Sequence, residues 1–205
     1  ILSALSILLA LMIIWGCNPK GKDESITTLP MSKIDQKVEE FEKVKLNADI
    51  SHLSEDQKEM LTHLIDAAKI MDEIFWHQAF GNKEELLNRI ETPYLKTFVE
   101  INYGPWERLN ENQPFIEGYD QKPAGANFYP EDMTKEEFEN FESEDKTSLY
   151  TLIRRDENGD LKTVPYNEAY ENKTQRAAGL LREAAKLAEN EGFKKYLNLR
   201  AEALL

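Results

Sequence analysis

The apolar residues between Ser54 and Phe80 follow the clearest helical pattern in the chain. They recur at spacings of three, four and seven residues, which draws one stripe along a helix of 3.6 residues per turn. The stripe consists of Met60, Leu61, Leu64, Ala67, Ala68, Met71, Ile74 and Phe75. Ser54 and Gln57 have the spacing of a capping box, and Gly81 follows where a glycine can end a helix. The sequence therefore predicts one long amphipathic helix around which the rest of the chain is organised.

Other segments predict shorter helices on both sides of this one. Their expected ranges are 34–44, 82–91, 93–101 and 134–141, then a helix from Asn167 with Ala177, Leu180, Leu181, Ala184, Leu187 and Ala188 on one face. Gly192 interrupts that pattern, and a further stripe runs from Phe193 to Leu204. Residues 103–130, rich in proline, glycine and aromatic residues, are expected to form a packed loop or a binding surface.

A β-hairpin is expected over residues 148–166. Two runs typical of strands flank Asn158 and Gly159, the dipeptide that most strongly favours a tight turn between antiparallel strands. Pro165 places the second strand at an edge or ends it early. The predicted fold class is therefore mainly α (α+β), with one small hairpin among helices.

The first sixteen residues carry no charge and are nearly all apolar. They are shorter than the ~20 residues that a membrane-spanning helix needs, and they suit the core of a signal peptide. The run ends at Cys17, the only cysteine, with Ile14 and Gly16 before it. This pattern resembles a bacterial lipobox, although Trp15 replaces the usual small residue, and it predicts a lipid on Cys17. The alternative is a plain membrane anchor with a chance cysteine.

The lipobox implies a position at the cell envelope. Asn18 follows the cysteine, which favours the outer membrane of a Gram-negative bacterium. The expected organisation is a signal peptide over 1–16 with its start missing, a lipidated cysteine and flexible tether over 17–44, and a domain over 45–205. The last apolar stripe reaches Leu205 without a cap, so the domain is expected to continue in a longer protein.

The acidic balance of the chain excludes one class of partner. The formal charge is −13, and lysines and arginines do not cluster. Nucleic-acid backbones are bound by clustered positive charge, so no nucleic-acid partner is expected.

Three motif-like patterns fail on inspection. Asp156–Asp160 resembles half of a calcium loop, but Leu161 and Asn167 stand where glycine and glutamate are required. Arg182 and Glu183 resemble part of a Nudix box without the paired glutamates that hold magnesium. The calcium and Nudix interpretations are therefore rejected.

A zinc site on the long helix is the third pattern. Glu73 and His77 lie one turn apart, and His63 lies on the same side. No His-Glu-x-x-His is present, so histidines bonded to neighbouring carboxylates or solvent are the preferred interpretation. The aromatic residues Trp76 and Trp106 are likewise more typical of a core than of a ligand site, as are Phe128 and Tyr129.

Several strings resemble one known family. They occupy residues 47–53, 71–78, 101–112, 123–130, 152–155 and 164–166. In this order they resemble the N-terminal part of bacterial proteins of the dipeptidyl peptidase III family of zinc metallopeptidases. The likeness runs from about residue 45 to the end, and the same region occurs in plant proteins behind a Nudix domain.

The resemblance implies the helical N-terminal lobe of a two-lobed enzyme that removes dipeptides from peptide N-termini. The family's zinc ligands lie on a His-Glu-x-x-Gly-His helix with a downstream glutamate, which this chain does not contain. No catalytic or metal residue can therefore be assigned, and the chain alone is expected to be inactive. Asn127, Phe128 and Tyr129 are expected to line the substrate cleft. The alternative is a non-catalytic surface lipoprotein that binds peptides or an envelope partner.

Overall fold

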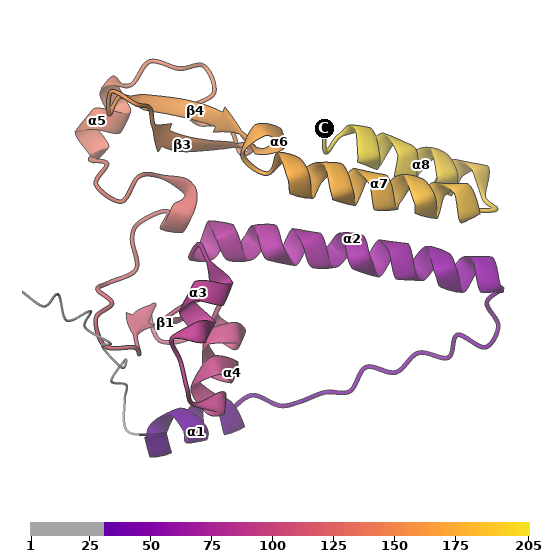
Figure 1. Cartoon of the computed structure of the whole chain (residues 1–205), viewed down its shortest axis with the longest axis horizontal. Helices are drawn as coiled ribbons and strands as arrows, with labels where there is room; N and C mark the ends of the chain where they lie inside the picture. The colour runs from indigo at the N-terminus through magenta and orange to yellow at the C-terminus, as the bar shows by residue number, and fades with distance from the viewer. Residues whose placement is uncertain (1–30) are drawn as a thin grey trace, which may run out of the picture.

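A computed structural model describes residues 31–205 and has a mainly helical fold with two small sheets (Figure 1). The helices are α1 (Met31–Glu39), α2 (Glu55–Ala79), α3 (Lys83–Asn88), α4 (Pro93–Asn102), α5 (Lys135–Asn140), α6 (Tyr166–Ala169), α7 (Glu171–Leu187) and α8 (Glu191–Glu202). The strands are β1 (Trp106–Glu107), β2 (Gln113–Pro114), β3 (Thr151–Arg155) and β4 (Leu161–Pro165), and η1 (Ala126–Phe128) is a 3-10 turn. The predicted fold class is confirmed.

The long helix α2 has the ends that its sequence predicts. Ser54 accepts from the backbone N–H of Gln57 at 3.2 Å, and the Gln57 side chain accepts from the backbone N–H of Ser54 at 3.1 Å. This reciprocal pair is the capping box. At the other end Gly81 has a φ of +131° and donates to the carbonyl of Trp76 at 3.1 Å. The glycine thus lets the chain leave α2 sharply towards α3.

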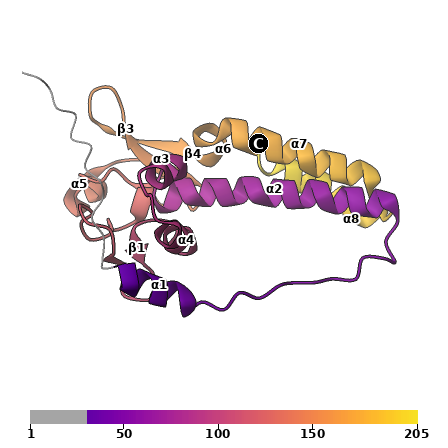
Figure 2. The same cartoon turned by 60° about the horizontal axis from the view of Figure 1, so that its bottom comes forward.

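The helices α2, α7 and α8 pack together as one helix layer, in which α7 contacts both of the others (Figures 1 and 2). The face of α7 in this layer is made mostly of small residues: Thr174, Ala177, Ala178, Ala184 and Ala185 are buried. Small side chains let neighbouring helices approach closely, so alanine fits a helix that contacts two others. Of the stripe that the sequence predicts, Ala177, Ala184 and Ala188 are buried and Leu180, Leu181 and Leu187 are half-buried, so the predicted face of this helix is confirmed.

A second packing unit, the aromatic core, lies at the end of α2 beside α1, α3 and α4. It buries Ile34, Trp76, Leu86, Ile90, Leu95, Phe98, Val99, Phe115 and Ile116. Phe98 lies at its centre, with its ring 4.6 Å from that of Phe115 and 6.3 Å from that of Phe41. In Figure 1 the helices α3, α4 and α1 that contribute to this core lie below one end of α2, and Phe115 and Ile116 join the irregular segment to it.

The hairpin between β3 and β4 confirms the Asn-Gly signal. Thr151 pairs with Pro165 and Arg155 pairs with Leu161. The turn contains Glu157–Gly159 and is closed by the backbone N–H of Asp156 donating to the carbonyl of Asp160 at 2.8 Å. Gly159 has a φ of +90°, as the last residue of a three-residue hairpin loop requires.

The first predicted helix has the wrong boundaries. It is α1, which ends at Glu39 instead of Val44, and residues 42–50 are exposed and without helix or strand. Short helices depend on packing: this segment packs against the aromatic core as far as Phe41, and the residues beyond it are exposed. Since Ile34 is buried in that core, the packed part of the chain begins before residue 45.

Two further expectations also need correction. The break before α8 lies at Ala188–Asn190 and not at Gly192, because the Asn190 side chain accepts from the N–H of Phe193 at 2.9 Å and caps the helix. On α2, Ala68, Met71 and Phe75 belong to the predicted stripe but are exposed. The layer α2–α7–α8 covers only part of that stripe.

Residues 1–30, which include the predicted signal peptide and Cys17, lie outside the described residues. Within the described part, none of the helices has the length and apolar character that crossing a membrane requires.

Candidate functional site

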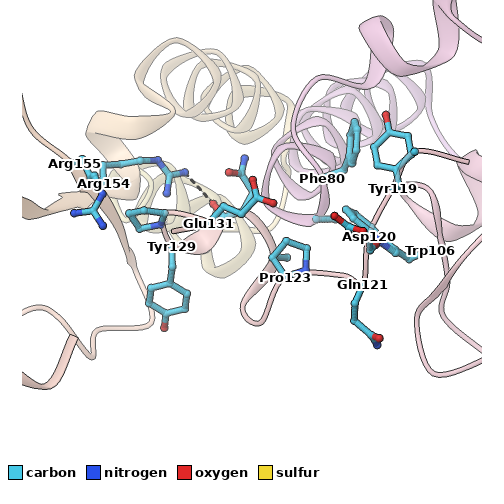
Figure 3. Close-up of a pocket in the computed structure, with 15 residues that line it drawn as sticks. Phe80, Trp106, Tyr119, Asp120, Gln121, Pro123, Tyr129, Glu131, Arg154 and Arg155 are labelled. Atoms are coloured by element: carbon cyan, nitrogen blue, oxygen red, sulfur yellow. Dashed lines mark hydrogen bonds between the residues drawn. The ribbon is translucent and has the colours of Figure 1, made fainter. Parts of the chain in front are cut away.

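A pocket of about 470 Å³ lies where the end of α2, the irregular segment and the hairpin meet (Figure 3). It is lined by Ala79, Phe80, Trp106, Gly118, Tyr119, Asp120, Gln121, Pro123, Ala126, Asn127, Tyr129, Pro130, Glu131, Arg154 and Arg155. This volume is within the range of ligand-binding cavities. The walls differ in chemistry, since one is aromatic and another carries two guanidinium groups.

The aromatic wall consists of Phe80, Trp106 and Tyr119. Their ring centroids lie 5.8 to 6.1 Å apart, and the indole N–H of Trp106 donates to the carbonyl of Asp120 at 2.8 Å. Burial raises the pKa of the Tyr119 hydroxyl, so this wall stays neutral at physiological pH. Such a surface suits an apolar or aromatic side chain of a ligand.

Asn127 connects the pocket loop to α2 and β3. Its side-chain amide donates to the carbonyl of His77 at 2.7 Å, and its own carbonyl accepts from Arg154 at 2.9 Å. Arg154 also donates to the carbonyls of Phe128 at 3.2 Å and Ile153 at 2.7 Å. Residues 50 positions apart are thereby held together, so the backbone of the pocket loop is fixed without a bound ligand.

The two arginines of β3 have different partners. Arg155 forms ion pairs with Asp132 and with Glu137 and donates to the carbonyl of Gly159. Its hydrogen bonds lower the pKa of both carboxylates. For Arg154, by contrast, the described residues supply only backbone carbonyls and no carboxylate within 4 Å. Arg155 therefore fastens the hairpin to α5, while the charge of Arg154 remains uncompensated beside the pocket.

Gly125 sets the position of Tyr129. Its φ is +81°, and a Cβ placed on it would lie 2.4 Å from the Tyr129 ring. A side chain at this position would therefore both strain the backbone and displace the ring. The Tyr129 ring also contacts Phe138 with a centroid distance of 6.0 Å. The conformation of the loop thus depends on a glycine that the ring covers.

Asp120 and Glu131 give the mouth of the pocket acidic character. Both are exposed and line the pocket, and neither forms an ion pair with any described residue. Figure 3 shows Glu131 between the arginines of the hairpin and the aromatic wall. These two carboxylates outnumber the one unpaired guanidinium of Arg154 in the pocket, which favours a ligand with a positively charged group.

No family model matches the chain, but two solved structures do. Dipeptidyl peptidase III from Caldithrix abyssi is 42% identical with a TM-score of 0.77, over 83% of this chain and 34% of that one. The enzyme from Corallococcus sp. strain EGB is 34% identical with a TM-score of 0.76, over 88% and 36% of the two chains. This chain is similar in sequence and fold to part of dipeptidyl peptidase III. It spans about a third of the length of each of these relatives.

One curated protein that resembles this chain is named as a Nudix hydrolase. The chain is 28% identical to Nudix hydrolase 3 of Arabidopsis thaliana, over 84% of this chain and 30% of that protein. The chain therefore matches a minority of that protein, and the residues that a Nudix box needs are missing at Lys186 and Leu187. The resemblance to dipeptidyl peptidase III is supported by both the sequence and the fold.

The three residues expected to line the substrate cleft do not all line the pocket. Asn127 and Tyr129 line the pocket, whereas Phe128 packs against the cluster around Ile70 and Ile74 and lines a neighbouring hollow of about 460 Å³. Sequence reasoning missed Phe80, Tyr119 and Arg154. Arg154 and Arg155 lie in one of the strings that carried the resemblance. Their local sequence does not show that one contacts backbone carbonyls and the other carboxylates. Trp76 is buried, as expected for a core residue, whereas Trp106 is buried and also lines the pocket.

The described residues do not fit a zinc site. Among them there is no group of three or more His, Cys, Asp or Glu side chains that could hold a metal ion. His63 lies 3.8 Å from Glu59, Glu73 pairs with Lys173, and His77 contacts the ring of Tyr170. His63 thus lies near a carboxylate, as the preferred interpretation has it, whereas the contact given for His77 is an aromatic ring. No step of a reaction can be derived through a metal held by residues 31–205.

Proposed function

We propose that this chain forms one wall of the peptide-binding cleft of a zinc-dependent dipeptidyl peptidase, which removes dipeptides from peptide N-termini. The observation that carries the proposal is the agreement of sequence and fold with dipeptidyl peptidase III of Caldithrix abyssi, at 42% identity and a TM-score of 0.77. The pocket described above supplies a preformed concave surface on this wall.

The chemistry of the pocket suits a peptide. The aromatic wall of Phe80, Trp106 and Tyr119 would contact side chains, and the free carboxylates of Asp120 and Glu131 would attract the positively charged amino terminus. The backbone that carries Asn127 is already fixed by Arg154, so binding would not require this loop to become ordered. We assign the chain to binding and orientation of the substrate, and the zinc ligands to sequence outside residues 31–205.

A chimera tests this function. Residues 31–205 replace the matched third of the Caldithrix abyssi protein, and hydrolysis of a dipeptide linked to a chromogenic amine is measured with zinc present. We expect the chimera to release dipeptides and the 205-residue chain alone to be inactive. A folded, zinc-loaded chimera that binds peptides without cleaving them would contradict the proposal and support the alternative of a non-catalytic peptide-binding lipoprotein.

The position at the cell envelope is a separate proposal, which is supported by the apolar run and Cys17. Its test is the incorporation of labelled palmitate in a bacterial host that processes lipoproteins. Label in the native chain that is lost in Cys17→Ala is the expected result. Label that survives the substitution would dispose of the lipobox, and a native chain without label would leave a plain membrane anchor.

A further inference from the structure

Two neighbouring hollows form a groove along α2 and α8 that shares no residue with the pocket. One hollow of about 340 Å³ lies between α2, α7 and α8, and another of about 710 Å³ lies between α2, α6, the residues before β3 and the end of the chain. Met71, Arg200 and Leu204 line both. We call this surface the α2–α8 groove; its other main apolar residues are Leu64, Phe75, Leu149, Tyr150, Phe193, Tyr196 and Leu205.

The groove exposes large apolar side chains next to one another. Phe75 is 44% exposed, Tyr196 is 55% exposed and Leu149 is 83% exposed. Single exposed apolar residues are ordinary, but proteins seldom leave a contiguous apolar surface open to water. A contiguous groove of this kind therefore indicates a surface that another part of a protein covers.

The sequence pattern of α2 supports the same conclusion. Ala67 and Ile74 of the predicted stripe line the groove but are buried under the neighbouring helices, while Met71 and Phe75 of the same stripe line it and are exposed. The apolar stripe is thus wider than the layer that packs on it within the described residues. Such a width is expected for a helix with partners on two sides.

The charge of the groove indicates what kind of protein surface could occupy it. Arg200 is the one charged residue among those lining the two hollows. It is exposed, and no carboxylate of the described residues lies within 4 Å of it. An occupant with an apolar surface and one carboxylate facing Arg200 would satisfy both features of the groove.

We propose that the α2–α8 groove is the docking surface for the part of a dipeptidyl peptidase III protein that this chain does not match. Both relatives have about two thirds of their length outside the matched region. In a protein of that length, the polypeptide following position 205 would start at the groove, because Leu204 and Leu205 line it. The proposal depends on the similarity of this chain to these proteins. It does not depend on whether the assembled protein cleaves peptides.

The chimera described above tests this proposal through stability and not through activity. A groove variant, Phe75→Ser with Tyr196→Ser, is compared with a control variant, Leu46→Ser with Leu109→Ser, whose side chains are exposed outside the groove. Because the ring of Phe75 also lies 4.7 Å from that of Tyr103, the groove variant should lower the Tm of the isolated chain slightly, and we expect it to lower the Tm of the chimera by at least about 5 °C more. The control variant should leave both unchanged.

A second measurement does not need a folded chimera. The unmatched part of the Caldithrix abyssi protein, expressed separately, is titrated into the labelled 205-residue chain. Binding should weaken at least 10-fold in the groove variant and in Arg200→Glu, with Arg200→Lys close to the native chain. Equal binding by native chain and groove variant, or an equal loss of Tm in the chimera and the isolated chain, would overturn the proposal. A homodimer of the isolated chain that the groove variant dissociates would instead assign the groove to a second copy.

Discussion

The aromatic core and the helix layer α2–α7–α8 solve the same packing problem with different side chains. The aromatic core joins α1, α3, α4 and the segment after β2 through large residues such as Phe98 and Phe115. The helix layer buries alanines, including Ala177 and Ala184. Large residues fill the space between segments that cross at many angles, whereas small ones let long helices lie close together. The first unit is closed on itself, and the second leaves one side of α2 open as a groove.

The largest expected effect concerns the aromatic core. Phe98 is 0% exposed and contacts Phe41 and Phe115, so Phe98→Ala removes a ring from a site that cannot easily collapse. We expect the free energy of unfolding to fall by about 3–5 kcal/mol, measured by urea denaturation. Tyr94→Ala, on the exposed side of the same helix, is the matched control. A loss below about 1 kcal/mol for Phe98→Ala would show that the core is not closed.

In the helix layer, a substitution that enlarges a buried side chain should lower the free energy of unfolding. Ala184 is 0% exposed between helices, so Ala184→Leu should cost about 1–3 kcal/mol of unfolding free energy through overpacking. Gly179 lies on the same helix with open space where a methyl group would be added, so Gly179→Ala should stabilise by about 0.5–1 kcal/mol. Equal tolerance of Ala184→Leu and Gly179→Ala in urea denaturation would contradict close helix packing.

This contrast also explains what the sequence could predict. The capping box at Ser54, the Asn158–Gly159 turn and the alanine stripe of α7 are local signals, and the structure confirms them. The carbonyl contacts of Arg154 and the bond from Asn127 to His77 join residues 27 and 50 positions apart, so no local pattern encodes them. The early end of α1 likewise depends on tertiary contacts, which in this segment reach only to Phe41.

A smaller effect is expected at the boundary between the two units, in the pocket loop. Gly125→Ala adds a methyl group that collides with the Tyr129 ring and forces alanine into a positive φ, so we expect a loss of about 1–2 kcal/mol of unfolding free energy. Gly118→Ala is the control, since its φ is also positive but nothing lies near the added carbon. If both variants lose the same stability, the contact with Tyr129 does not hold the loop.

The smallest effect should appear as a pH dependence of the hairpin. Arg155 lowers the pKa of Asp132 and Glu137 from 3.8 and 4.5, so their contribution to stability is present above those values and is lost as the pH falls through the lower folded values. In Arg155→Gln the difference in Tm between pH 7 and pH 3 should be smaller than in the native chain. Arg182→Gln, an exposed control on α7, should leave it unchanged. An identical difference in Arg155→Gln would contradict this role.

The central claim, that the pocket is a wall of a peptidase cleft, is tested most directly by the KM of the chimera for a dipeptidyl substrate. Asn127→Ala with Tyr129→Ala is compared with Asn172→Ala with Tyr94→Ala, matched residues that do not line the pocket. The account predicts that KM rises about 10-fold in the pocket variant, corresponding to about 1.4 kcal/mol of lost binding, and stays unchanged in the control. A KM that is equal in both variants, in a chimera that remains folded and active, would contradict it.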